Sequence, residues 1–168
     1  MMGRVEALEL IVDEGQPANA GRFFQLGHDL LALLDELSDV PVPWWIRSLR
    51  TGSALATLAP PNEHPEHGRV LRLAVASLNA VDRGFRLSDE WTPDAIKAAH
   101  RFVEHGQPTD LEENWVPPRL VLLTEGSGPA PTVVLTPELG DRLRELTPFV
   151  RSMPGSVRGE LVGLNVSR

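Results

Sequence analysis

The stretch RVEALELIV at residues 4–12 is the feature that most limits how this chain can fold. Side chains alternate between the two sides of a β-strand, and here both sides are mostly apolar. The two sets are Leu8, Leu10 and Val12 on one side and Val5, Ala7 and Ile11 on the other. A strand of this kind belongs inside a sheet rather than at its margin, so the segment predicts an interior strand.

Four later segments have the spacing or the start signals of helices. In residues 21–37, 69–84 and 93–106, apolar side chains recur at intervals of three and four, which places them on one helix face. The Thr-Pro-acid triplets at residues 92–94 and 136–138 each supply a capping threonine, a proline at the first helical position and an acid near the positive helix start. The second triplet therefore predicts a fourth, short helix, which a later proline ends.

Short apolar or alternating stretches between the helices predict further strands. They are WWIRSLR (44–50), SALATLA (53–59), RLVLLT (119–124) and TVVLT (132–136). The elements follow a β-α-β-β-α-β order with one extra helix, which is compatible with a ferredoxin-like, split βαβ arrangement. We predict an α+β fold in a single domain, residues 1–150, with a mainly antiparallel sheet and helices packed on one face.

The final stretch, GSVRGELVGLNVSR at 155–168, predicts one more strand. Gly155, Gly159 and Gly163 would share one side of it with Leu161, which leaves a nearly bare strip of backbone. Three interpretations are open: the strand completes the sheet of the domain, it pairs with an edge outside that domain, or it is a disordered tail. An outside edge would belong to a second copy or to another protein.

Three segments of the chain resemble a family of uncharacterised bacterial proteins of actinobacterial type. They are RTGSALATL (50–58), LTPELGDRL (135–143) and GSVRGELVGLNVSR (155–168). In that family an α+β N-terminal domain is followed by a β-rich module, which comes after a segment of the GSVxGxLxxLN type. The resemblance implies no activity, cofactor or site residue. It does imply that residues 151–168 are a C-terminal strand that starts a second module, the rest of which this chain lacks.

Composition narrows the classes of function. The net charge is −7, which repels phosphate backbones, so we expect no nucleic-acid partner. The chain has no cysteine, which excludes thiol nucleophiles and disulfides. No signal peptide is recognisable, and no stretch approaches the roughly 20 apolar residues of a membrane span. We therefore expect a cytoplasmic protein without a membrane partner.

One polar loop carries residue types that could do chemistry. His64 and His67 lie there with two glutamates, which makes a small metal-dependent hydrolase the alternative function. Pro65 argues against it, because a proline breaks the helical geometry that would align the two histidines. We interpret Glu112 and Glu113 as solvated acids, and no catalytic sequence motif is present. We predict no catalytic residue, metal or cofactor.

Trp44 and Trp45 are adjacent, so in a strand one ring faces the core and the other faces outward. An exposed ring would be an anchor for a partner. Our preferred interpretation is instead that the outer ring packs under a helix or loop, because tryptophan is usually well buried. Together with the C-terminal strand, these residues predict a non-enzymatic protein-interaction or assembly module that pairs with a protein partner or a second copy.

Overall fold

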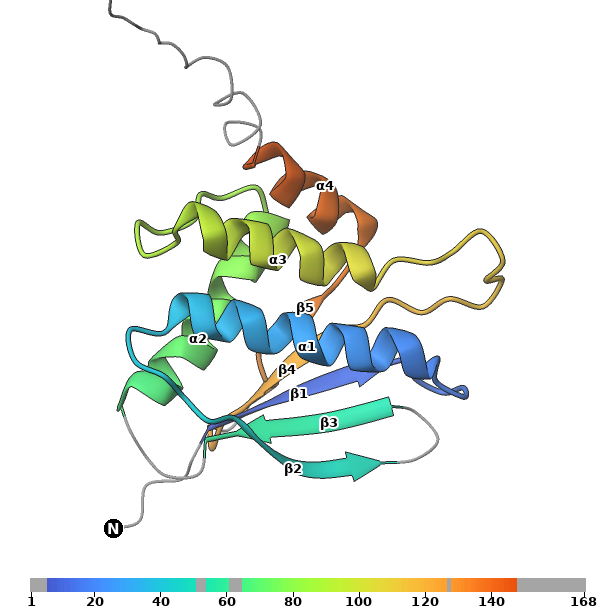
Figure 1. Cartoon of the computed structure of the whole chain (residues 1–168), viewed down its shortest axis with the longest axis horizontal. Helices are drawn as coiled ribbons and strands as arrows, with labels where there is room; N and C mark the ends of the chain where they lie inside the picture. Colours follow the sequence, from blue (N-terminus) through green and yellow to red (C-terminus); the bar gives the residue numbers. More distant parts are fainter. Residues whose placement is uncertain (1–5, 51–53, 61–64, 127, 148–168) are drawn as a thin grey trace, which may run out of the picture.

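The computed structural model describes residues 6–50, 54–60, 65–126 and 128–147. Nine elements lie in these ranges (Figure 1). The strands are β1 (Ala7–Val12), β2 (Trp45–Arg50), β3 (Ala54–Ala59), β4 (Arg119–Leu123) and β5 (Thr132–Val134). The helices are α1 (Ala20–Leu37), α2 (Pro65–Asp82), α3 (Pro93–His105) and α4 (Pro137–Glu145). Nine of the predicted elements are thus present, in the predicted order.

The five strands form one sheet in the order β2-β3-β1-β4-β5, and every neighbouring pair is antiparallel. β1 is the central strand, which confirms the prediction from its two apolar sides. Because β1 and β2 both run antiparallel to β3, they are parallel to each other, and α1 connects them around the inserted β3. This is the predicted split βαβ arrangement. α3 is the extra helix, and β5 and α4 extend the sheet beyond β4.

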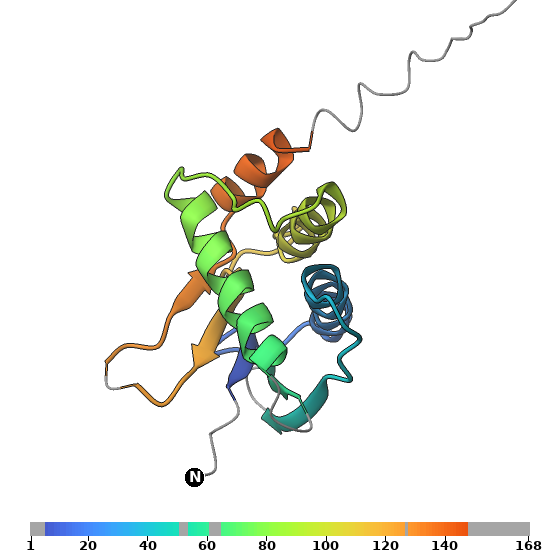
Figure 2. The same cartoon turned by 90° about the vertical axis from the view of Figure 1, so that its left-hand side faces the viewer.

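The helices pack on one face of the sheet, as predicted (Figure 2). Leu8, Leu10 and Val12 of β1 form one buried cluster with Leu120 and Leu122 of β4 and with residues from all four helices. Burying a leucine side chain of this kind contributes about 1.5–3 kcal/mol to stability. The α+β class follows from this layer of helices on an antiparallel sheet.

Helix starts agree with the sequence signals at three of the four helices. The side chains of Asn19, Thr92 and Thr136 cap α1, α3 and α4 by accepting from the backbone N–H three residues later. α2 differs, because it begins at Pro65 inside the stretch predicted as a polar loop. A proline fits the first turn of a helix, where its missing N–H would have no helical partner. The prediction that residues 65–68 belong to a polar loop was therefore wrong.

The C-terminal strand predicted at 151–168, with Gly155, Gly159, Leu161 and Gly163, lies outside the described residues. Within the described ranges, no helix combines the length and the apolar character that crossing a bilayer requires.

Candidate functional site

β2 is the outermost strand at one end of the sheet, and none of the described strands pairs with its outer side. All six of its residues are exposed. Its large apolar side chains, Trp45, Ile46 and Leu49, are 58%, 60% and 62% exposed. An unpaired strand with exposed apolar side chains is a template for pairing with another chain. We call residues Trp45–Arg50 with this free outer side the β2 edge.

The apolar side chains of the β2 edge lie on both sides of the sheet. Ile46 is opposite Leu58, a core residue of β3, so Ile46 is on the helix-facing side, and Leu49 shares that side. Trp45 is on the opposite side. Ile46 and Leu49 nevertheless remain exposed, because the described helices do not extend over β2. The β2–β3 hairpin lies at the margin of the molecule, next to α1 (Figure 1).

Trp44, just before β2, and Trp45, its first residue, face different environments. Trp44 is partly buried against the core, and the centre of its ring lies 6.1 Å from that of His67. Trp45 is mostly exposed. Our preferred prediction, that the outer ring packs under a helix or loop, was wrong. The reason is that Trp45 lies on the side of the sheet away from the helices, on an edge strand, and its own sequence does not reveal either fact.

Two features of the β2 edge modify its pairing capacity. The register with β3 shifts between Ile46 and Ser48, so Arg47 sits in a β-bulge, which adds local twist. Arg47 and Arg50 are the only charged residues between positions 40 and 62 of a chain whose net charge is −7. The edge is therefore apolar, locally twisted and basic, and these properties select among partners.

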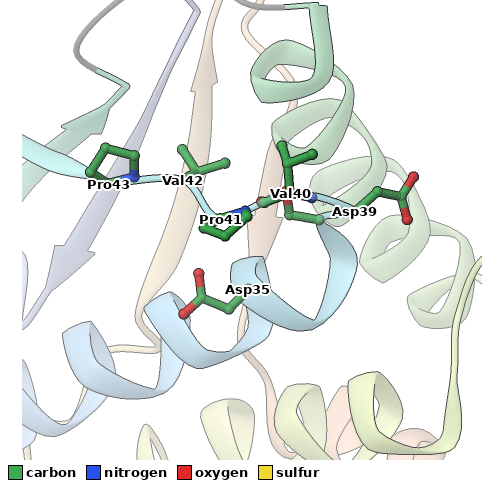
Figure 3. Close-up of a pocket in the computed structure, with 7 residues that line it drawn as sticks. Asp35, Asp39, Val40, Pro41, Val42 and Pro43 are labelled. Carbon is green, nitrogen blue, oxygen red and sulfur yellow. The ribbon is translucent and has the colours of Figure 1, made fainter.

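A pocket of about 590 Å³ adjoins the start of β2 (Figure 3). It is lined by Asp35, Ser38, Asp39, Val40, Pro41, Val42 and Pro43. The carboxylates of Asp35 and Asp39 point away from each other in Figure 3, and Asp39 is paired with Arg69 at 3.6 Å. They do not form the close carboxylate pair that acid–base catalysis uses. The pocket extends the exposed apolar surface next to the β2 edge.

A buried ionic cluster joins the N-terminal end of α1 to the loop before β4. Arg22 lies 3.1 Å from Asp13, and it also donates to Glu112. The hydrogen bond from Arg22, together with backbone N–H donation from Thr109, lowers the pKa of Glu112 to about 2. The prediction that Glu112 is a solvated acid was wrong. The cluster holds the loop against α1, and Arg22 is paired with both carboxylates.

Asp29 is a nearly buried carboxylate on α1 that contacts the last residue of α3. Its Oδ2 lies 2.5 Å from Nδ1 of His105, and its Oδ1 accepts from Gln25 at 3.0 Å. This contact ties the two helices together. Residue spacing does not predict this contact, because Asp29 and His105 are far apart in the chain and neither lies in a motif.

The structure does not favour the predicted alternative of a metal site at His64 and His67. His67 lies in the first turn of α2 and is buried beside Trp44, and His64 lies outside the described residues. Across the part of the chain that the structure describes, no group of three or more His, Asp and Glu side chains could hold a metal ion.

Comparison with known protein families, with curated proteins and with solved structures finds no match to this chain. The relation to an uncharacterised bacterial family therefore stays a prediction from the three resembling segments. The β2 edge remains the strongest candidate site on physical grounds alone.

Proposed function

We propose that this protein is a cytoplasmic, non-enzymatic interaction or assembly module, and that its docking site is the β2 edge. The observation that carries the proposal is the exposure of Trp45, Ile46 and Leu49 on an unpaired strand. Exposed large apolar side chains gathered on one element mark an interaction site more often than isolated ones do.

The partner binds as an extended segment. Its main chain adds a strand to the β2 edge, which satisfies the free backbone N–H and C=O groups on both partners. Side chains of the added strand then contact Ile46 and Leu49 on one side of the sheet and Trp45 on the other. The aromatic ring anchors the segment, since tryptophan is among the residues that contribute most to binding.

A site-specific photo-crosslinker tests this proposal in the cells that produce the protein. We would place the photoreactive side chain at Leu49 and, as a matched control, at Phe85, which is 68% exposed in the connection after α2. We expect a discrete adduct from position 49 and none from position 85. The protein identified in the adduct should bind the purified chain and should lose that binding in a Leu49→Glu variant.

Equal adduct yields at the two positions would contradict the proposal, because they would show that exposure alone explains the cross-linking. Unchanged binding by the Leu49→Glu variant would contradict it as well, since a charge at the centre of the β2 edge cannot be accommodated beside an apolar partner.

A further inference from the structure

We propose that the partner of the β2 edge is an extended segment with ordered charge, which places acidic side chains beside Arg50, apolar side chains along the middle of β2 and basic side chains toward Asp35. This inference rests on the proposed function and names the chemistry of the partner. It follows from the two sides of β2 and from the different charges at its two ends.

The bulge in β2 determines which of its side chains share a side. Ile46 and Leu49 stand on the helix-facing side. Trp45, Ser48 and Arg50 stand on the other side, because the register shifts by one residue between Ile46 and Ser48. A strand added to the β2 edge alternates in the same way. Its apolar side chains therefore contact Ile46 and Leu49, and its charged side chains lie on the side of Trp45 and Arg50.

The end of β2 carries an available positive charge. Arg50, the last residue of the strand, is exposed, and across the described ranges no carboxylate pairs with its guanidinium. Two acids follow β1 at the same end of the sheet, but each has an arginine of its own. Asp13 lies 3.1 Å from Arg22. Glu14 lies 2.6 Å from Arg119. An acid on an added strand is therefore the natural partner of Arg50.

The start of β2 is acidic. Asp35 lines the pocket that precedes the strand (Figure 3), and no cation among the described residues pairs with its carboxylate. Asp39, in the same pocket, lies 3.6 Å from Arg69. Arg69 is paired with Glu66 and Glu90 as well, so three carboxylates share one guanidinium. The negative end of α1, which has no basic residue in its last turn, adds to this charge.

Arg47 does not remove the difference between the two ends. Its guanidinium donates to the carbonyl of Pro60 at 3.2 Å. Pro60 follows the β3 residue that pairs with Trp45, so this hydrogen bond holds the Arg47 charge beside the start of β2. Four carboxylates against the guanidiniums of Arg69 and Arg47 still leave the start negative.

The two ends act separately on a bound segment. β2 has six residues, so at about 3.4 Å per residue its first and last residues lie about 17 Å apart. The Debye length at physiological ionic strength is about 8 Å, so a charge at one end of the segment is largely screened from the other end of β2. The order of charges along the segment therefore decides the fit, and its net charge does not.

The sheet also favours one direction for the segment. Every neighbouring pair of described strands is antiparallel, and antiparallel pairing is slightly more stable per residue than parallel pairing. An antiparallel segment places its N-terminal half beside Arg50 and its C-terminal half beside Trp45. The acids therefore belong in the N-terminal half. The basic residues belong in the C-terminal half, where a cation over the exposed indole of Trp45 adds a cation–π attraction.

Two synthetic peptides of equal composition test the order of charge. The first alternates valine with glutamate in its N-terminal half and valine with lysine in its C-terminal half. The second exchanges the glutamates and the lysines, so length, apolar content and net charge stay the same. Fluorescence anisotropy of the labelled peptides would measure their affinities for the full chain.

We expect the first peptide to bind about tenfold more tightly than the second, since a well-placed pair of opposite charges is worth up to about fivefold and both ends contribute. Arg50→Glu should remove this preference. Arg101→Glu, an equal change of net charge at an exposed position of α3, should leave it intact. In about 1 M salt, where the Debye length falls to about 3 Å, the preference should shrink to less than about twofold.

Equal affinity of the two peptides, tighter binding of the second, or no binding of either would overturn the inference. A preference that survives Arg50→Glu would overturn it as well, because the charge would then be recognised elsewhere. Dimers of the chain alone that Leu49→Glu dissociates would show that a second copy occupies the edge, although two copies of net charge −7 repel each other.

The photo-crosslinker at Leu49 separates this failure from failure of the proposed function. An adduct at Leu49 together with equal affinity for the two peptides overturns only the ordered charge of the partner. The absence of any adduct overturns the docking site itself, and the inference with it.

Discussion

The two ends of the sheet are protected to different degrees. β5 has three residues, and the chain turns from it directly into α4. Leu135 donates its backbone N–H to Pro118 at 2.8 Å, and Leu139 and Leu143 of α4 are buried in the core. β2 has six residues, all exposed, and the described helices leave its apolar side chains uncovered.

Sheet edges are usually protected by short length, by charge, by a bulge or by cover from another element. β5 is short and α4 follows it closely, whereas β2 has only its bulge and two arginines. The contrast shows that exposure of the β2 edge is not a general property of this sheet. It therefore favours the β2 edge as the place where another chain binds.

The largest expected effect is a loss of folding stability, caused by a charge introduced into β5 itself. Val133 is buried on the helix-facing side of β5, opposite Leu120. We expect Val133→Asp to lower the free energy of unfolding by on the order of 4 kcal/mol, because the carboxylate would be buried without a partner. The matched change Leu49→Asp on β2 should cost less than about 1 kcal/mol.

Urea denaturation at low protein concentration, where association does not contribute, would measure both changes. Similar losses for the two variants would mean that Leu49 is packed in solution, which would remove the contrast between the two ends of the sheet.

The second expected effect is on binding. Leu49→Glu should weaken binding to the purified partner by about 30-fold or more, the range of a residue that dominates an interface. Val134→Glu, on the exposed part of β5, should change it by less than about twofold. Isothermal titration calorimetry would measure the affinity of each variant for the partner. A greater loss from Val134→Glu would move the docking site to the other end of the sheet.

A third prediction concerns the loop that leads into β4. Glu112→Gln should lower the free energy of unfolding at neutral pH by about 1.5 kcal/mol, since it replaces a charge-assisted hydrogen bond to Arg22. The folded pKa of Glu112, about 2, lies below the ordinary value of 4.5. Its contribution to stability is therefore complete above pH 4.5 and is lost as the pH falls toward 2.

The difference between the parent chain and Glu112→Gln should accordingly shrink across this pH range. Urea denaturation at several pH values would measure it. A difference that stays constant down to pH 2 would show that the carboxylate charge is not the source of the stabilisation.

The smallest expected effect is at the start of α4, the helix that follows β5. The side chain of Thr136 accepts from the N–H of Leu139 at 3.2 Å, and Thr136→Ala should cost about 1 kcal/mol. Ser48→Ala on β2 removes one part-buried hydroxyl contact to Thr57 and should cost less than about 0.5 kcal/mol. Thermal denaturation would compare the stability losses of the two variants. A larger loss from Ser48→Ala than from Thr136→Ala would contradict the contrast between the β2 end and the β5 end of the sheet.

Local sequence patterns were sufficient to predict most of the fold. The two apolar sides of β1 identified a central strand, and the Thr-Pro-acid triplets located the starts of α3 and α4. α2 was placed too late, because residues 65–68 were interpreted as part of a polar loop although a proline at the first helical position is favourable. These signals act over a few residues, so one sequence is enough to detect them.

The candidate site was less predictable because it depends on strand order. Whether Trp45 is covered is decided by the position of β2 at the end of the sheet, not by its neighbours in the chain. The pairs Arg22–Glu112 and Asp29–His105 likewise join distant parts of the sequence. Long-range proximity of this kind leaves no mark on residue spacing.

The central position of β1 also has a consequence for biosynthesis. β1 leaves the ribosome before the other described strands, yet Leu8 pairs with Leu58 on one side and with Leu122 on the other. At translation rates of about 5–20 residues per second, the second neighbour emerges roughly 6–23 seconds after β1. During this interval the nascent chain exposes the middle of its future sheet, so a chaperone that shields apolar strands would have its greatest effect then.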